Sequence, residues 1–263
     1  MGYVKTAEEI ERIQVAQSEP RFVDAEMLSV DFLSDPAAIE RLLPPPLAPG
    51  DTPRVTAMVG RWRSNCVADF DGGAIYVSAT FGDLAGDYVL AMWMDDDQPM
   101  IYGREMFGEP KKLARSQLYR SGDHFSATIT RHGVDLLALE ADLDIDHGPG
   151  RAAGINFNFK SRPATDGIGL EEDAILTVAE FNNVLRVSRS GSGTVALTGT
   201  VHDPLDELPV VEVIGARFIE GDLHASARSV ATVPMADFLP YALGRVDDWS
   251  LLNTEGSPRI LTS

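Results

Sequence analysis

Residues 103–114 read Gly-Arg-Glu-Met-Phe-Gly-Glu-Pro-Lys-Lys-Leu-Ala, and two adjacent lysines stand near the end of this stretch. Pro110 fixes its own φ and biases Glu109 toward an extended conformation, so the lysines follow on a defined backbone. In an extended chain, the side chains of consecutive residues point to opposite faces. Only one of Lys111 and Lys112 can therefore enter the interior of a closed sheet.

Lysine is scarce in this chain, which makes the adjacent pair informative. Only four of the 22 basic residues are lysines, and two of these four are neighbours. Since arginine carries almost all of the other positive charge, solubility alone does not explain the pair. A solvated pair of lysines on a loop remains the structural alternative.

A lysine in a sheet interior would be a reactive group. Burial disfavours the charged ammonium, and a second cation nearby acts in the same direction. The neutral amine is a nucleophile toward ketones, and the iminium that it forms is an electron sink. The stretch therefore indicates Schiff-base chemistry if one of the two lysines is buried.

Helices are predicted near the two ends of the chain. Residues 6–17 carry apolar side chains at helical spacing. Ser34-Asp35-Pro36 is a helix start, because a capping side chain precedes a proline, and this helix ends at the prolines of residues 44–46. Residues 236–243 form a short predicted helix close to the C-terminus.

Between the helices, short β-rich runs alternate with turn sequences such as residues 71–73, 95–97 and 190–193. The predicted strands are residues 74–81, 88–94, 125–130, 134–143, 155–160, 175–181, 184–187, 193–201 and 210–218. This spacing is typical of an antiparallel sheet that is closed or doubled, giving a mainly β protein with a few helices. No linker marks a second domain, so we expect one domain over residues 1–263.

Composition and charge exclude several functions. The formal net charge of -18 disfavours binding to nucleic acid or to an anionic membrane surface, because both require clustered cations. One cysteine excludes a disulfide framework and a cysteine-based zinc site, and the five histidines lack metal-ligand spacing. The first 20 residues contain no apolar core of a signal peptide, and we expect a cytoplasmic protein.

The stretch from Gly103 to Ala114 closely resembles the lysine motif of the acetoacetate decarboxylase superfamily. Three other regions resemble the same superfamily in the same order, and they are residues 41–47, 86–88 and 204–210. The resemblance extends over roughly residues 20–240. The lysine motif is specific, and the other three regions support it.

The resemblance implies a cone-shaped antiparallel β-barrel that works without a metal or an organic cofactor. It implies a small keto acid as substrate and a homo-oligomer of four or more chains. By motif position, Lys111 is the Schiff-base lysine and Lys112 is the neighbouring cation that favours its neutral form. Because adjacent side chains of a strand diverge, desolvation has the larger expected effect on Lys111.

The chain departs from the superfamily pattern at three polar positions. An acidic residue expected upstream of the lysines falls at Gly72, and a one-residue shift to Asp71 would place the carboxylate on the other face of a strand. A second expected glutamate falls near Thr56, and an expected arginine falls near Ala25. Loss of a carboxylate that transfers protons costs about 10²–10⁴ in rate, so efficient decarboxylation of acetoacetate is not expected.

Four residues are the candidate companions of Lys111, besides a rearranged Asp71. Glu109 precedes it by two residues and shares its face in an extended chain. Arg104 is a candidate for binding the substrate carboxylate, with an ion pair to its neighbour Glu105 as the alternative. Tyr76 is a candidate for substrate binding and Tyr241 for proton donation, with packing as the alternative role of each.

Three functions remain open at this point. The first is a pyruvate aldolase-dehydratase, in which the lysine enamine condenses with an aldehyde and water is then eliminated. The second is decarboxylation of acetoacetate or a related β-keto acid, with Asp71 or Glu109 replacing the missing glutamate. The third is a barrel that binds small ligands without turnover and uses the lysines as an electrostatic clamp.

Overall fold

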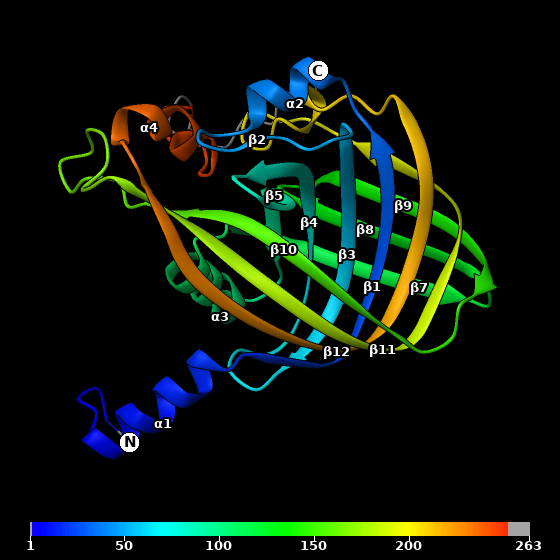
Figure 1. Ribbon diagram of the computed structural model, residues 1–263, viewed down its shortest axis with the longest axis horizontal. Coiled ribbons are helices and arrows are strands. Elements are labelled where there is room, and N and C mark those ends of the chain that lie inside the picture. The colour runs from blue at the N-terminus through cyan, green and yellow to red at the C-terminus, as the bar shows by residue number, and fades with distance from the viewer. Residues whose placement is uncertain (1, 252–263) are drawn as a thin grey trace.

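Seven strands form a closed ring in the computed structural model, which describes residues 2–251 (Figure 1). Around the ring their order is β10 (Gly150–Lys160), β5 (Leu84–Met94), β4 (Ala68–Phe81), β3 (Arg54–Ser64), β1 (Arg21–Leu33), β12 (Glu212–Val233) and β11 (Ala174–Leu197). The pairing of β10 with β11 closes the ring. All of its pairings are antiparallel except the two-residue contact of β10 with β5. The predicted fold class, a mainly β protein built on a closed sheet, is confirmed.

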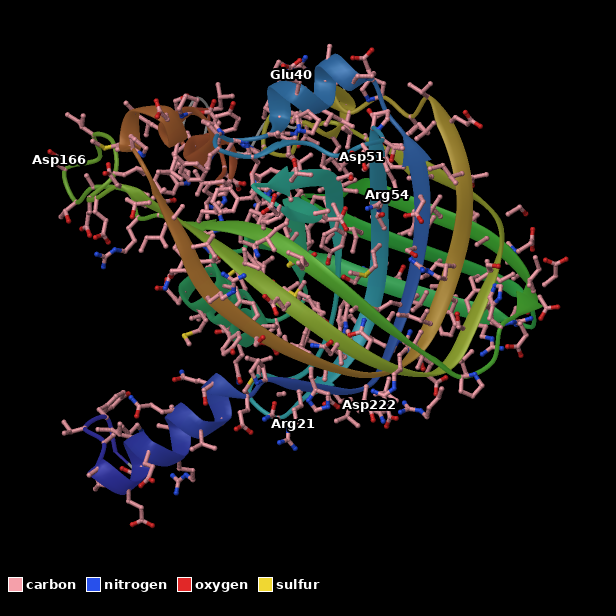
Figure 2. All side chains as sticks on the ribbon, in the orientation of Figure 1. Arg21, Glu40, Asp51, Arg54, Asp166 and Asp222 are labelled. Atoms are coloured by element: carbon pink, nitrogen blue, oxygen red, sulfur yellow. The ribbon has the colours of Figure 1, made fainter. Side chains whose placement is uncertain are left out.

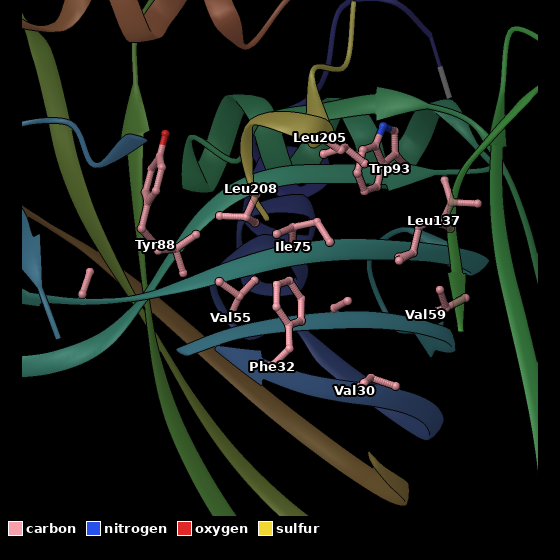
Figure 3. Packing of buried hydrophobic residues seen from close by; sticks show 14 of the residues in the cluster. Val30, Phe32, Val55, Val59, Ile75, Tyr88, Trp93, Leu137, Leu205 and Leu208 are labelled. Atoms are coloured by element: carbon pink, nitrogen blue, oxygen red, sulfur yellow. The ribbon is translucent and has the colours of Figure 1, made fainter. Parts of the chain in front are cut away.

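A second layer of strands covers one outer side of the ring. The far half of β11, from Arg189 onward, pairs with β9 (Val134–Asp146), which continues to β8 (His124–Arg131) and β7 (Arg115–Ser121). The main hydrophobic core fills the space between this layer and the ring. Val30, Phe32, Val55 and Ile75 of the ring belong to one cluster with Leu137 of β9, and Figure 3 shows Val59 of the ring beside Leu137.

The helices lie outside the ring and match the predicted positions. Helix α1 (Ala7–Ser18) is capped by Thr6 and projects away from the body (Figure 1). Helix α2 (Pro36–Leu42) is capped by Asp35, and α4 (Met235–Gly244) lies near the C-terminus, so all three predicted helices are confirmed. None of the helices within residues 2–251 is long and apolar enough to span a membrane.

The remaining short elements surround the lysine stretch or the end of the ring. They are β2 (Ala48–Pro49), α3 (Asp97–Tyr102), the π-helical turn η1 (Gly103–Phe107), β6 (Lys111–Leu113) and the 3-10 turn η2 (Leu205–Glu207). Asp96 caps α3 by accepting a hydrogen bond from the backbone of Gln98. The acidic run at residues 95–97, predicted to be a turn, therefore starts a helix.

Candidate active site

The segment that leads to Lys111 turns sharply and then joins the sheet. Gly108 ends η1 with a φ of 79°, and a Cβ at this position would lie 2.6 Å from the backbone nitrogen of Lys160. Only glycine allows both the left-handed backbone and this close approach to β10. After Pro110, β6 pairs in parallel with Met92–Met94 of β5, which fixes the direction in which each lysine points.

Lys111 is buried and forms an ion pair inside the ring. Its side chain is 9% exposed, and its Nζ lies 2.8 Å from Oε2 of Glu109. The same Nζ donates a hydrogen bond to the carbonyl oxygen of Pro99 at 3.1 Å. It also lies 6.0 Å from the centroid of the Phe70 aromatic side chain. The amine therefore has a carboxylate partner in a site largely removed from water.

A cavity of about 340 Å³ extends from Lys111 and Glu109 through the inside of the ring. One part of its wall is apolar and rich in methionine and aromatic side chains, which are Phe22, Met27, Met58, Trp62, Phe70, Met92, Met94 and Leu223. The other part is polar and includes Ser29, Arg54, Thr56, Asp87, Asn156 and Arg217. The cavity can thus take a ligand that has both a polar and an apolar end.

Tyr76 brings a hydroxyl group into the same cavity. Burial raises the pKa of Tyr76, and the negative charge of Glu109 raises it further, so the phenol keeps its proton at neutral pH. Tyr76 lines the cavity together with Glu109 and Lys111, and its role in substrate binding stays a prediction. An amine, a carboxyl group and a phenol in one apolar enclosure can together transfer protons around a bound carbonyl compound.

An ion-paired group lies at the polar part of the cavity. Arg54, on β3 (Figure 2), donates to Asp87 at 2.6 Å and to Thr56 at 2.6 Å. Thr56 in turn donates to Asp31 at 2.5 Å. Burial raises the pKa of Asp87, although the charge of Arg54 opposes this. The arginine is thus held by carboxylates of its own chain, and sequence reasoning missed this group.

Lys112 points away from the cavity and is neutralised by two carboxylates. Its Nζ lies 3.1 Å from Asp203 and 3.3 Å from Asp247. Arg131 binds the other oxygens of the same two carboxylates, each at 2.7 Å. The two lysines diverge as the strand argument predicts. Lys112 therefore does not act as an unpaired cation beside Lys111.

The Lys112 cluster predicts acid-sensitive stability. Burial alone would raise the pKa of Asp247, but the hydrogen bond from Arg131 and the charge of Lys112 outweigh it and lower the pKa to about 2. A pKa below the ordinary value of 3.8 means stability that is complete above about pH 5 and lost as the pH falls toward 2. We expect Asp247→Asn to lower the free energy of unfolding by about 2 kcal/mol at pH 7.

Urea unfolding of both proteins at pH 7 and pH 3 checks this expectation. The difference in their free energies of unfolding should shrink at pH 3, because part of the stabilisation by the ionised Asp247 carboxylate is lost at that pH. A difference that is the same at both pH values would show that the carboxylate does not stabilise the fold through its charge.

Two further predicted residues, Arg104 and Tyr241, lie outside the Lys111 cavity. Nη1 of Arg104 donates to the backbone oxygen of Lys111 at 3.0 Å, so this arginine holds the lysine backbone and does not face the substrate space. Tyr241 lines a separate cavity. Within the described chain Arg104 forms no contact ion pair with Glu105, although the Glu105 charge opposes the lowering of the Arg104 pKa by burial.

Asp71 lies on the wrong face of β4 for a role at Lys111. Phe70, Ala74 and Tyr76 face the cavity, whereas Asp71 stands opposite Arg61, whose guanidinium reaches β7 of the outer layer. Burial raises the pKa of Asp71, and the charge of Arg61 opposes that effect. The hypothesis from the sequence that Asp71 takes the role of the expected acidic residue is therefore wrong.

The position expected to carry the family carboxylate is closed. A Cβ on Gly72 would lie 2.5 Å from Cε of Met94 and 2.5 Å from the backbone oxygen of Trp93. The thioether of Met94 thus occupies the space of an acidic side chain. Ala25, where an arginine was expected, is fully buried in an apolar cluster with Trp62 and Met58.

Metal ligands do not gather in the part of the chain that the structure describes. No three His, Cys, Asp or Glu residues within residues 2–251 form a group that could hold a metal ion. The chemistry of the cavity is that of an amine, a carboxyl group and a phenol. Independence from metals and cofactors stays a prediction.

Comparison with known proteins identifies relatives of the whole barrel. The family model for acetoacetate decarboxylase matches residues 9–233. Acetoacetate decarboxylases of Burkholderia ambifaria and Burkholderia cenocepacia are each 31% identical over 216 residues, covering 77% of this chain and 84% of the relative.

Solved structures with the same fold have lower sequence identity. Acetoacetate decarboxylase of Legionella pneumophila is 21% identical with a TM-score of 0.74, and the alignment covers 81% of this chain and 88% of that one. The enduracididine biosynthesis enzyme MppR, complexed with the condensation product of pyruvate and imidazole 4-carboxaldehyde, is 20% identical with a TM-score of 0.69. That alignment covers 80% of this chain and 88% of MppR.

Proposed function

The chain belongs to the acetoacetate decarboxylase family, and we propose that it joins pyruvate to an aldehyde through a Schiff base on Lys111. The observation that carries the proposal is the Lys111–Glu109 pair, 2.8 Å apart at the wall of a cavity whose usual family carboxylate position, Gly72, is closed. The nucleophile and one acid–base group are present, whereas the group expected for decarboxylation is not.

Iminium formation needs a neutral amine and a proton for the leaving oxygen. Transfer of one proton from Lys111 to Glu109 supplies both. The amine then attacks the keto carbon of pyruvate, and the carbinolamine oxygen leaves as water with the proton from Glu109. The product is an iminium whose positive charge lies beside the Glu109 carboxylate.

Carbon–carbon bond formation follows from the same groups. Glu109 removes a proton from the methyl group of the iminium, which gives an enamine. The enamine carbon attacks the aldehyde carbon, and the new alkoxide takes the Tyr76 proton. Glu109 then protonates the hydroxyl, which leaves as water while the Tyr76 phenolate removes a second proton from the former methyl carbon.

Hydrolysis of the unsaturated iminium completes the cycle. A water molecule releases the product and returns the free amine of Lys111. In total, pyruvate and an aldehyde give one α,β-unsaturated 2-keto acid and one water. Tyr76 has already recovered its proton during the elimination of water, so the enzyme ends in its starting state.

The size and lining of the cavity favour condensation. A volume of about 340 Å³ is at the lower end of the range for drug-sized ligands and exceeds the need of a four-carbon keto acid. The apolar wall around Phe70, Met92 and Met94 suits an aldehyde with an aromatic or long alkyl substituent. A barrel of the same fold, MppR, holds a condensation product of pyruvate in its structure.

Decarboxylation of a β-keto acid is the second candidate. The relatives at 31% identity are named acetoacetate decarboxylases. An apolar wall also weakens the solvation of a substrate carboxylate, which favours loss of carbon dioxide from the iminium. This reaction also passes through an iminium on Lys111. It reaches the enamine by breaking a C–C bond in place of a C–H bond, and the enamine then takes a proton in place of an aldehyde.

Borohydride trapping separates the candidates. The protein is incubated with pyruvate or acetoacetate, reduced, and analysed by intact mass and peptide mapping, while carbon dioxide release and enone absorbance are followed without reductant. We expect an adduct on Lys111 with pyruvate and an enone when an aromatic aldehyde is added. Carbon dioxide from acetoacetate without any enone would establish the second candidate, and a folded protein without any adduct would favour ligand binding without turnover.

Glu109→Gln should lower kcat by about 10²–10³, because an amide cannot exchange the proton that each step requires. The fold should be retained, since the amide can still accept a hydrogen bond from Lys111. The matched control is Glu105→Gln, an exposed residue of the same segment, which should change kcat less than about twofold. Equal losses in both variants would argue against a specific role of Glu109.

A further inference from the structure

A second cavity lies on the other side of the segment that carries Lys111. Its volume is about 460 Å³, and its walls come from α2, β5, β6, the η2 region and α4. Pro110 and Lys112 face this cavity, whereas Glu109 and Lys111 face the ring interior. The two cavities therefore share a wall of four consecutive residues, and the proposed reaction makes no use of the second one.

Arg245 is a cation at this cavity without a carboxylate partner. Its guanidinium donates to the carbonyl oxygens of Phe159, at 2.5 Å, and of Gly108. Within residues 2–251, no Asp or Glu forms an ion pair with it. Burial lowers the pKa of Arg245 to about 10, although Tyr88 and the more distant charge of Glu109 oppose this effect, so the guanidinium is charged at neutral pH. The guanidinium also lies 5.8 Å from the centroid of the Phe238 aromatic ring. A partly buried charge whose hydrogen bonds go only to carbonyl oxygens favours an anionic ligand.

Two tyrosines line the same cavity as this guanidinium. Tyr88 and Tyr241 both line the cavity, and burial raises the pKa of Tyr88 to about 12 while the charge of Arg245 opposes that effect. In Figure 3, the Tyr88 hydroxyl points away from the aliphatic side chains around it. Neither hydroxyl has a hydrogen-bond partner in the described part of the chain. Both can donate to a ligand that Arg245 attracts.

The other charges of the cavity are already compensated. Lys112 is neutralised by Asp203 and Asp247, and Arg41 lies 3.7 Å from Glu207 in an exposed pair. The remaining wall is largely apolar and includes Leu42, Leu90, Trp93, Leu205, Leu208 and Pro240. The cavity thus offers one uncompensated positive charge with two hydroxyl donors, next to a hydrophobic surface.

We propose that this second cavity binds a monocarboxylate with an apolar tail. The carboxylate accepts hydrogen bonds from Arg245, Tyr88 and Tyr241, and the tail contacts the apolar wall. Because the other cations of the cavity are already paired with carboxylates, a second negative group on the ligand would find no free cation, so dicarboxylates and phosphates fit less well. Since Arg245 also holds the Gly108 carbonyl, the ligand would contact the residue that holds the Lys111 segment in place.

Calorimetric titration with octanoate tests the proposal on the full chain, with 1-octanol as the neutral probe of similar shape. We expect octanoate to bind wild type and Lys111→Met equally, and octanol to bind at least about tenfold more weakly. Arg245→Gln should weaken octanoate binding by about tenfold or more. Tyr241→Phe, which removes a single oxygen atom and keeps the packing surface, should weaken it about three- to tenfold.

Four outcomes would overturn the proposal. They are no binding at about 5 mM octanoate, equal affinity for octanol, unchanged affinity in Tyr241→Phe, and loss of binding in Lys111→Met. The last would place octanoate in the ring interior. If Arg245→Gln does not fold, the tyrosine variant and the octanol comparison still decide the question, because neither removes a buried charge.

Discussion

Lys111→Met should lose about 10⁴-fold or more of the wild-type turnover, whichever keto acid is the substrate. Both candidate reactions pass through an iminium on this amine, and methionine fills a similar volume without a nucleophile. Borohydride should leave no adduct on the variant. Because Glu109 would remain buried without its partner, the double variant Lys111→Met, Glu109→Gln provides a reference that leaves no unpaired charge at this site.

Lys112→Met is the matched control, since the same substitution is made one residue later. Its amine faces Asp203 and Asp247 outside the ring, so its loss should lower the free energy of unfolding by about 1–3 kcal/mol. Turnover per folded molecule should change less than about tenfold, and the adduct on Lys111 should persist. Retained activity in Lys111→Met, or an adduct that maps to Lys112, would contradict the assignment.

The sequence predicted the closed β sheet and the three confirmed helices, but it divided the strands incorrectly. Strands β1 and β3 were missed, because charged side chains such as Glu26 and Arg61 pair across their outer faces and obscure the β pattern. β11 was expected as three separate runs. Its Ser-Gly sequence lies inside the strand, where Gly191 lets the β9 backbone approach so closely that a Cβ would lie 3.0 Å from the Asp142 carbonyl carbon.

The site was predictable where it depends on local geometry. Alternation along the strand placed Lys111 and Glu109 on one face and Lys112 on the other. Contacts between distant segments were not predictable in this way. The pairing of Arg54 with Asp87 joins residues 33 positions apart, and the contact of Arg104 with the Lys111 backbone depends on the π-helical turn. The homo-oligomer, the single domain and the cytoplasmic location stay predictions.

Gly103→Ala should lower kcat by about 10²–10³ while the protein stays folded. A Cβ at this position would lie 2.5 Å from Cδ and 2.6 Å from Nζ of Lys111, and closer still to Oε2 of Glu109. The nucleophile and its acid–base partner would both have to move. A displacement of about 1 Å at a reacting group can cost about 10²-fold in rate, and here two groups are displaced.

The folded state should tolerate this alanine, which separates the prediction from simple destabilisation. Gly103 has helical angles, φ -63° and ψ -41°, so alanine fits the backbone and restricts the unfolded chain. The atoms in the way are the ends of two long side chains, which can rotate. Gly150→Ala is the control, because its Cβ would meet nothing within 4 Å, and it should leave both Tm and kcat unchanged. If Gly103→Ala kept wild-type kcat, the amine and the carboxylate would have to work from positions other than those seen here, and the proposed role of their 2.8 Å pair would be wrong.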